Sequence, residues 1–528
     1  MGLFNLRKTY SGDVPPKSTS AIYCGVSTFR DACYQLVSAF LITYITLSGV
    51  LDPDPKMFMT QIATITVITI ICLVWDGLND PIMGWIIEKV HFKWGKYKPW
   101  ILIGGILNTI VVLVLFLAHP TGWGFVALFA VFYFLWDIAW TINDIAYWSM
   151  LPSLTKDEAR RNKITSVMQI CISIGVFGIY GAVPMLVGRF ENVPAQKVYG
   201  IIAIVVTALF LLSQIALVFF CKEHKEEDVG EKKEEEVKFR DMITLFKRND
   251  QFRVNIIAIL LNYLGGGTVV GFGMYYFYLR YGYGAEAGGN IQFLFTIMYA
   301  VGTLLAQVAY PFLSKFLKRK NVLLISFITI LIGYLMLFVV GFPVFSGNII
   351  ADPKSWTIFL LYGAGAIMFF GQGLFAVAII MQMQSTIEYN EFKFGERKEA
   401  LVSSMRALVA KFSSAIQRLL IFLTLLISGL YAISRVISNA EAELASGSMT
   451  SAELTQEIDT AREGISRGQW LTFSIGMLWV PLILLVISLF LSRFVFKIDE
   501  AKYQEMVNEL NMRKQAAAEK QPEQEVVE

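Results

Sequence analysis

The stretch PWILIGGILNTIVVLVLFLA, residues 99–118, contains no charged side chain. At 1.5 Å per residue, a helix of this length spans about 30 Å, which matches the hydrocarbon core of a bilayer. Similar apolar runs, separated by short charged loops, recur along the chain. Of its 528 residues, 55% are hydrophobic and 16% are charged, whereas about a quarter are charged in a typical soluble protein. The pattern therefore predicts an all-α protein that crosses a membrane many times.

Twelve apolar segments are expected to span the membrane, and the basic residues between them predict their orientation. The segments lie near 32–50, 58–87, 99–118, 122–147, 164–187, 197–220, 253–281, 288–314, 321–343, 355–388, 400–432 and 470–494. The even-numbered gaps between segments carry 23 lysines and arginines, and the odd-numbered gaps carry eight. Because cytoplasmic loops are enriched in Lys and Arg, the even gaps and both termini are predicted to be cytoplasmic.

The longest internal gap divides these segments into two groups of six. Its mixed lysines and glutamates are typical of a solvated linker. The predicted parts are an N-terminal six-helix bundle (1–221), a cytoplasmic linker (222–252), a C-terminal six-helix bundle (253–496) and a cytoplasmic tail (497–528). The stretch KDEARR at 156–161, after the fourth segment, resembles KFGERK at 393–398, after the tenth. Parallel repeats of six helices are typical of the major-facilitator fold, whose binding site lies between the halves near the midplane.

Two segments outside the spans are expected to form helices. In the outer gap 433–469, Thr450 and Glu453 have the spacing of a capping box, which predicts the start of a short surface helix. The tail is expected to form an amphipathic helix at about 499–514, followed by a polar end.

Charged residues inside the spans mark the candidate sites, because each costs about 2.5–3.5 kcal/mol on insertion scales. Asp76, Asn79 and Asp80 share one face of the second span, since they are three and four residues apart. Oxygen ligands suit a hard cation, and Thr141 of the fourth span can add its hydroxyl. These four residues predict an alkali-ion site. The alternative is that the acids only pair with a basic residue of a neighbouring helix, such as Lys411.

A second group suits a sugar. Asp137, Thr141, Asp144 and Trp148 form one stripe on the fourth span, and Arg30 and Asp31 lie where the first span begins. A carboxylate accepts hydrogen bonds from neighbouring hydroxyls, and an indole offers a flat apolar face to a sugar ring. We therefore expect Asp144, Trp148 and Asp31 to bind a sugar. Trp148 is equally typical of an aromatic anchor at the membrane interface.

Several stretches resemble one transporter family. They are WDGLNDPIMGW at 75–85, WGKYKPWILIG at 94–104, TINDIAYWSMLP at 141–152 and EYNEFK at 388–393. The chain resembles the glycoside–pentoside–hexuronide:cation symporters over most of its length. The resemblance implies a major-facilitator fold with twelve transmembrane helices that carries a sugar together with Na⁺, Li⁺ or H⁺. It implies cation ligands at Asp76, Asn79, Asp80 and Thr141, and sugar-binding residues at Asp31, Asp144, Trp148, Arg30 and Lys411.

The chain departs from the best-matching member of that family at two positions. Gln169 stands where that member has a sugar-binding arginine, and Ala376 stands where it has a tryptophan. Because an arginine fork and an aromatic wall select particular hydroxyls, the sugar specificity is not carried over, and Gln169 is kept as a candidate sugar contact. Arg418, two turns beyond Lys411, is expected to compensate for the missing charge.

Residues of the cytoplasmic loops are expected to act in gating. Gly84, Arg160, Arg161 and Arg397 are the candidates, together with Gly95 and the lysines Lys89, Lys93, Lys96 and Lys98. Their expected partners in salt bridges are Glu88, Asp157, Glu391 and Glu396. The alternative is that these basic residues only set the orientation in the membrane.

The sequence thus predicts a symporter of the cell membrane that couples sugar uptake to Na⁺ or H⁺, with Na⁺ favoured. It predicts no enzyme activity and no cofactor beyond the coupling ion. Its partners are expected to be the sugar and the lipid bilayer, with no nucleic acid and no obligatory protein partner. The alternatives are a lysolipid or amphiphile carrier on the same fold and a membrane sugar sensor that does not transport.

Overall fold

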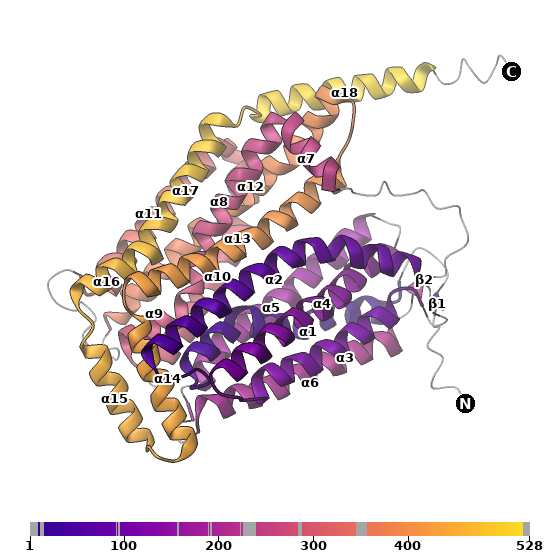
Figure 1. Cartoon of the computed structure of the whole chain (residues 1–528). Helices are drawn as coiled ribbons and strands as arrows, with labels where there is room; N and C mark the ends of the chain where they lie inside the picture. The colour runs from indigo at the N-terminus through magenta and orange to yellow at the C-terminus, as the bar shows by residue number, and fades with distance from the viewer. Residues whose placement is uncertain are drawn as a thin grey trace. The chain divides into compact units, whose positions relative to one another are not determined.

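The computed structural model describes residues 9–10, 15–90, 92, 95–155, 158–187, 189–190, 193–221, 223–224, 239–283, 288–344 and 356–520. In these residues nearly all of the chain is helical (Figure 1). The first helices are α1 (Lys17–Leu47), α2 (Pro55–Lys89), α3 (Lys98–Leu117), α4 (Trp123–Leu154), α5 (Glu158–Val187), α6 (Ala195–Phe220) and α7 (Phe239–Arg248). Two strands of two residues each, β1 (Thr9–Tyr10) and β2 (Glu223–His224), pair in parallel.

The remaining helices follow α7 along the chain. They are α8 (Asp250–Gly271), α9 (Gly273–Tyr281), α10 (Asn290–Phe316), α11 (Arg319–Gly341), α12 (Ile358–Phe394), α13 (Glu399–Ile427), α14 (Tyr431–Ser446), α15 (Ser451–Glu463), α16 (Arg467–Ser474), α17 (Val480–Phe490) and α18 (Glu500–Lys520). Two π-helical turns, η2 (Ile475–Trp479) and η3 (Leu491–Val495), flank α17. The predicted tail helix is present as α18, although it continues to Lys520 rather than ending near residue 514.

Eleven segments of the described residues are long and apolar enough to cross a membrane, and they match the second to twelfth predicted spans. The first predicted span lies in α1, which has 31 residues and is also long enough. It is not among the eleven because polar side chains such as Arg30, Asp31 and Gln35 lower its hydropathy. The first span therefore combines a spanning length with an unusually polar face.

Two predicted spans are not single α-helices. The span predicted at 253–281 is divided at Phe272 into α8 and α9. The last span, predicted at 470–494, contains both π-helical turns. Pro481 lies in the first turn of α17, directly after η2, and a proline cannot donate a backbone hydrogen bond to the preceding turn. Such local breaks are not visible in hydropathy.

The chain forms two compact units. The first contains 1–231, 271–297 and 422–469, and the second contains 232–270, 298–421 and 470–528. The predicted division into bundles at 1–221 and 253–496 stays a prediction. Within the predicted linker 222–252, the described residues include β2 and the short helix α7.

In the first unit, α1 packs against α5 and α6, while α4 packs against α2 and α3. A close approach joins α5 to α1, because a Cβ atom at Gly175 would lie only 2.0 Å from the carbonyl oxygen of Thr28. The core here includes Tyr23, Ile87, Tyr147 and Met168. In the second unit, α11 packs along α12, which also contacts α18.

The outer gap predicted at 433–469 forms a helical hairpin of α14 and α15 (Figure 1). The capping box is confirmed, since the Thr450 side chain accepts from the Glu453 N–H and the Glu453 carboxylate accepts from the Thr450 N–H. The hairpin packs on the rest of the first unit, where Ser438 Oγ accepts a 3.2 Å bond from the Gly49 N–H. Gly49 has φ of +74°, and a Cβ there would lie 2.7 Å from the Ala442 nitrogen, so only glycine fits.

Candidate functional site

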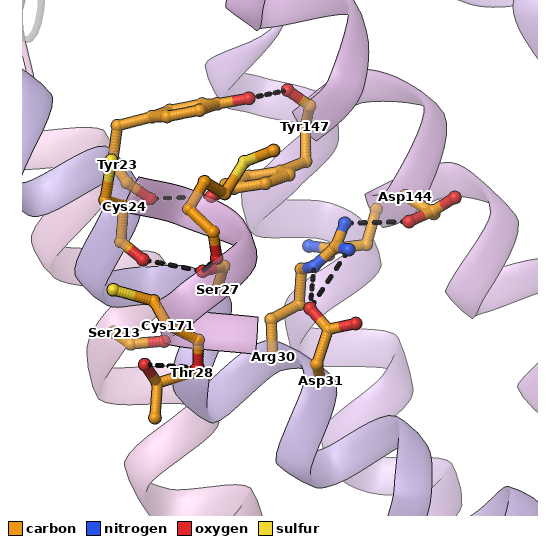
Figure 2. A network of polar contacts seen from close by, with 12 residues as sticks. Tyr23, Cys24, Ser27, Thr28, Arg30, Asp31, Asp144, Tyr147, Cys171 and Ser213 are labelled. Atoms are coloured by element: carbon orange, nitrogen blue, oxygen red, sulfur yellow. Dashed lines mark hydrogen bonds and ion pairs between the residues drawn. The ribbon is translucent and has the colours of Figure 1, made fainter. Parts of the chain in front are cut away.

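Helices α1 and α4 bring the predicted sugar-binding charges together (Figure 2). Arg30 of α1 donates from Nη1 to Asp144 Oδ1 of α4 at 2.7 Å. It also donates from Nη2 and Nε to Asp31 Oδ2, at 3.2 and 3.3 Å. The guanidinium therefore links two carboxylates that are far apart in the chain. The predicted cluster of Arg30, Asp31 and Asp144 is one network in the structure.

The three charges differ in their access to solvent. The side chain of Arg30 is only 2% exposed, that of Asp31 is 15% exposed and that of Asp144 is 36% exposed. A buried charge is tolerated when it is paired and hydrogen-bonded, and Arg30 has two anionic partners. The cluster therefore extends from a buried cation to a half-exposed carboxylate that can meet a ligand.

Aromatic rings surround the guanidinium. Its Cζ atom lies 4.4 Å from the ring centre of Tyr147, 5.3 Å from Trp140 and 5.9 Å from Trp148. A cation over an aromatic face is attracted by the ring quadrupole, most strongly when water is excluded. Trp148, predicted as a sugar platform or a membrane anchor, is half-buried beside the charge network.

Each carboxylate uses only one of its oxygens to bind Arg30. Among the described residues, Asp31 Oδ1 and Asp144 Oδ2 accept no hydrogen bond (Figure 2). An ionised carboxylate oxygen is an acceptor only, so these two atoms suit donors such as hydroxyl groups. The arrangement provides two acceptors and an indole in one place.

The predicted cation ligands lie on α2 and α4, which pack against each other. The Thr141 hydroxyl approaches Asp76 Oδ1 at 3.5 Å. Asn79 is buried, while Asp76 and Asp80 are half-buried. The Asn79 side-chain nitrogen donates to no residue that the structure describes. The structure thus brings Thr141 near Asp76, and the role of the four residues in binding a cation stays a prediction.

Four other predicted residues lie on α5 or in the second unit. Gln169 on α5 has an exposed side chain, and its main-chain carbonyl accepts a hydrogen bond from the Ser173 hydroxyl. Lys411 and Arg418 on α13 and Ala376 on α12 belong to the second unit, and all three are half-buried. Their predicted roles, and the alternative pairing of Lys411 with the acids of α2, stay predictions.

One of the predicted gating arginines has acidic partners within the second unit. Arg397 approaches Glu391 at 3.2 Å and Glu388 at 3.7 Å. Glu396, another expected partner, instead approaches Lys398 at 3.7 Å. The Arg397 and Glu391 pair agrees in geometry with the expectation, although the gating role stays a prediction.

The other predicted gating residues belong to the first unit. Gly84 is half-buried, and a Cβ atom added there would meet none of the described atoms within 4 Å. Arg160 is exposed and Arg161 half-buried. The lysines differ, since Lys89 is exposed, Lys96 half-buried and Lys98 buried. Lys93, Asp157 and the side chain of Glu88 lie outside the described residues.

Sequence reasoning missed the residues that surround Arg30. Trp140 and Tyr147 lie four residues before and three after Asp144, so the helical period places them beside it. That spacing was the available signal. The contact of Tyr147 with Tyr23 had no such signal, because it joins residues 124 positions apart.

Comparison with known proteins gives consistent matches over nearly the whole chain. Residues 29–500 match the family model described as MFS/sugar transport protein. The chain is 27% identical to a lactose permease of Leuconostoc lactis, covering 93% of this chain and 71% of that protein. It is 26% identical to a raffinose carrier protein of Pediococcus pentosaceus, covering 91% and 69%.

A solved structure shows the same fold. It is a bacterial homolog of the human lysosomal transporter Spinster, in an inward-facing and unoccupied conformation, with a TM-score of 0.58. The likeness covers 92% of this chain and 97% of that chain at 12% identity, so it concerns the fold alone. Together with the family model, it confirms the predicted major-facilitator fold.

Proposed function

The chain belongs to the MFS/sugar transport protein family, and from this premise we propose that it is a symporter coupling sugar uptake across the cell membrane to a cation. It is a multi-pass transporter and not an enzyme. The relatives named above are likewise named as a permease and a carrier. The observation that carries the proposal is the pair of available carboxylate oxygens, Asp31 Oδ1 and Asp144 Oδ2, beside Arg30 and Trp148.

The sugar would bind through this network. Two of its hydroxyls donate to Asp31 Oδ1 and Asp144 Oδ2, and the apolar face of its ring packs on Trp148. Arg30 supplies the counter-charge of both acids and holds them in place. Because the relatives include proteins named for lactose and raffinose, the substrate class is a glycoside or short oligosaccharide.

The coupling ion would bind at Asp76, Asn79, Asp80 and Thr141, and Na⁺ is favoured over H⁺ and Li⁺. The amide oxygen of Asn79 is a useful ligand for a metal ion, whereas it adds little to the affinity for a proton. A monovalent cation that crosses a potential of 100 mV releases about 2.3 kcal/mol, which can drive accumulation of sugar.

Helix α4 provides the link between the two sites. Thr141 contacts Asp76, and Asp144 lies one turn further along the same helix. A bound cation that fixes Thr141 against α2 therefore also fixes the position of Asp144. Coupling between two binding sites is reciprocal, so Na⁺ should raise sugar affinity by the same factor as sugar raises Na⁺ affinity.

The test is a panel of radiolabelled α- and β-galactosides, glucosides, xylosides and glucuronides, each with and without Na⁺. Binding to purified protein and uptake into proteoliposomes are both measured. We expect at least one sugar to bind and accumulate, and Na⁺ to increase both. Sugar affinity that follows pH but ignores Na⁺ and Li⁺ would assign the proton. Binding without uptake would contradict transport and identify a sensor.

Variants separate the two sites. Asp31→Asn and Asp144→Asn should each abolish protection by sugar against heat, because each removes a charged acceptor. Asp76→Cys should lose the stimulation by Na⁺ while keeping some sugar binding. Asp241→Asn on α7, an exposed acid outside the spans, is the matched control and should behave as the wild type.

A further inference from the structure

Tyr23 of α1 and Tyr147 of α4 form a reciprocal pair. The Tyr23 hydroxyl donates to the main-chain oxygen of Tyr147 at 2.8 Å, and the Tyr147 hydroxyl donates to that of Tyr23 at 2.6 Å. Their rings are stacked, with centres 4.5 Å apart and planes 4° from parallel (Figure 2). Both side chains are fully buried. The pair connects the two helices that carry Asp31 and Asp144.

Arg30 also stacks on Tyr147. Its Cζ atom lies 4.4 Å from the ring centre, the shortest of its three aromatic distances. Tyr23 and Arg30 are seven residues apart on α1, which is two helical turns, so both reach Tyr147 from the same face. The guanidinium thus stacks on a ring that itself stacks on, and is hydrogen-bonded to, Tyr23.

The orientation of the guanidinium decides how many acceptor atoms remain for a ligand. An arginine beside a carboxylate favours a bidentate arrangement, in which two N–H groups occupy both oxygens. In the structure Arg30 instead binds one oxygen of Asp31 and one of Asp144. A guanidinium that turned toward a single acid would occupy both of its oxygens and leave the other acid without its cation.

We propose that Tyr147 is a positioning residue for sugar binding, which holds the Arg30 guanidinium so that one oxygen of each acid stays available. Tyr23 supports Tyr147 by fixing the orientation and position of the Tyr147 ring. The inference rests on the proposed function, because the available oxygens matter only when a ligand uses them. Its experiment also has a readout that needs no sugar.

The first readout is sugar affinity. Tyr147→Leu removes the ring and should weaken binding about 5- to 30-fold, the range expected for a desolvated cation–π contact. Tyr147→Phe keeps the ring over Arg30 and should bind within about threefold of wild type, after losing one neutral hydrogen bond. Equal affinities for the Leu and Phe variants would overturn the proposal. If Tyr147→Leu does not fold, Tyr147→Met takes its place.

The second readout is thermal unfolding without sugar, for Tyr147→Leu, Arg30→Gln and the double variant. If the ring holds the guanidinium, the double variant should melt above the temperature expected from adding the two single shifts. Additive shifts in melting temperature would show that the Tyr147 ring does not hold Arg30. This result would overturn the proposal even if no sugar that binds the protein is identified. Tyr44→Leu is the matched control, since Tyr44 is equally buried on α1 but packs on Phe116. Tyr44→Leu should melt below the wild type and leave sugar affinity unchanged. Its shift in melting temperature should add to that of Arg30→Gln in the double variant.

Discussion

Two sites of the first unit hold carboxylates in different ways, the α1–α4 network and Glu441 of α14. In the network, Asp31 and Asp144 share the cation of Arg30. Glu441 is only 3% exposed, and its two oxygens accept from neutral donors. These are the Ala195 N–H, at 2.7 Å, and the Tyr283 hydroxyl, at 2.5 Å. Within the described part of the chain, Glu441 has no lysine or arginine partner.

The difference has a physical consequence for titration. Burial raises the pKa of Glu441 to about 7, and the hydrogen bonds from Tyr283 and Ala195 lower it only in part. Ala195 is the first residue of α6, so its N–H lies at the positive end of a helix. The hairpin is therefore held by an acid that changes its charge near neutral pH, while the acids of the network keep a permanent counter-charge.

The largest effect is expected from removing the counter-charge. Arg30→Gln leaves the largely buried Asp31 and the half-exposed Asp144 without their cation, which should cost about 3–5 kcal/mol of unfolding free energy. Thermal or denaturant unfolding of the purified protein measures the loss. The triple variant Arg30→Gln, Asp31→Asn, Asp144→Asn should recover part of it. Equal losses in the single and triple variants would show that Arg30 acts by packing rather than by charge.

Glu441 should make docking of the hairpin depend on pH. The pKa of Glu441 in the folded protein is about 7, above its usual 4.5. Its contribution to the stability of the docked hairpin is therefore complete below pH 4.5 and is lost as the pH rises through 7. The change amounts to about 3 kcal/mol, at 1.36 kcal/mol for each pKa unit. Hydrogen exchange in 431–463, corrected for the intrinsic pH dependence of amide exchange, should show lower protection at pH 8 than at pH 5.

Glu441→Gln should remove this pH dependence, because an amide stays neutral throughout the range. Glu443→Gln is the matched control, since Glu443 lies exposed on the same helix. It should retain the wild-type profile. A wild-type pH profile in Glu441→Gln would mean that another group controls the hairpin.

A smaller effect is expected from a substitution that weakens helix α15 of the hairpin without changing the contacts by which the hairpin docks. Thr450→Ala removes the side chain that caps α15 and should cost about 1 kcal/mol. Hydrogen exchange should increase in the first turn of α15 at both pH 5 and pH 8. Thr455→Ala, an exposed position inside the same helix, is the control and should change exchange less. If hydrogen exchange increased only at pH 8, the effect of the cap would depend on the charge of Glu441 instead.

The smallest effect on stability is expected where charges are exposed. Arg397 is 46% exposed, so its pairs with Glu388 and Glu391 should contribute only about 0.2–1 kcal/mol. Arg397→Glu should therefore unfold nearly as the wild type, yet slow transport while leaving sugar binding largely intact. Unchanged uptake would leave Arg397 with a role in membrane orientation alone.

Much of the fold and part of the candidate site follow from local sequence patterns. Hydropathy located the spans, and the residue spacing predicted the capping box of α15. Helical period placed Asp76, Asn79 and Asp80 on one face, and the polar residues of α1 and α4 indicated Arg30, Asp31 and Asp144, which form one network in the structure. These features depend on residues within a few turns of one another, which a sequence displays directly.

Tertiary structure alone decided which of these charges meet. Arg30 could have paired with one acid or none, and packing of α1 against its neighbours placed it between Asp31 and Asp144. Tyr23 and Tyr147, which form two reciprocal hydrogen bonds, are 124 positions apart in the chain. Glu441 and Ala195, which form a buried hydrogen bond, are 246 positions apart. Burial and pairing depend on which helices become neighbours, and hydropathy and helical period carry no information about that choice.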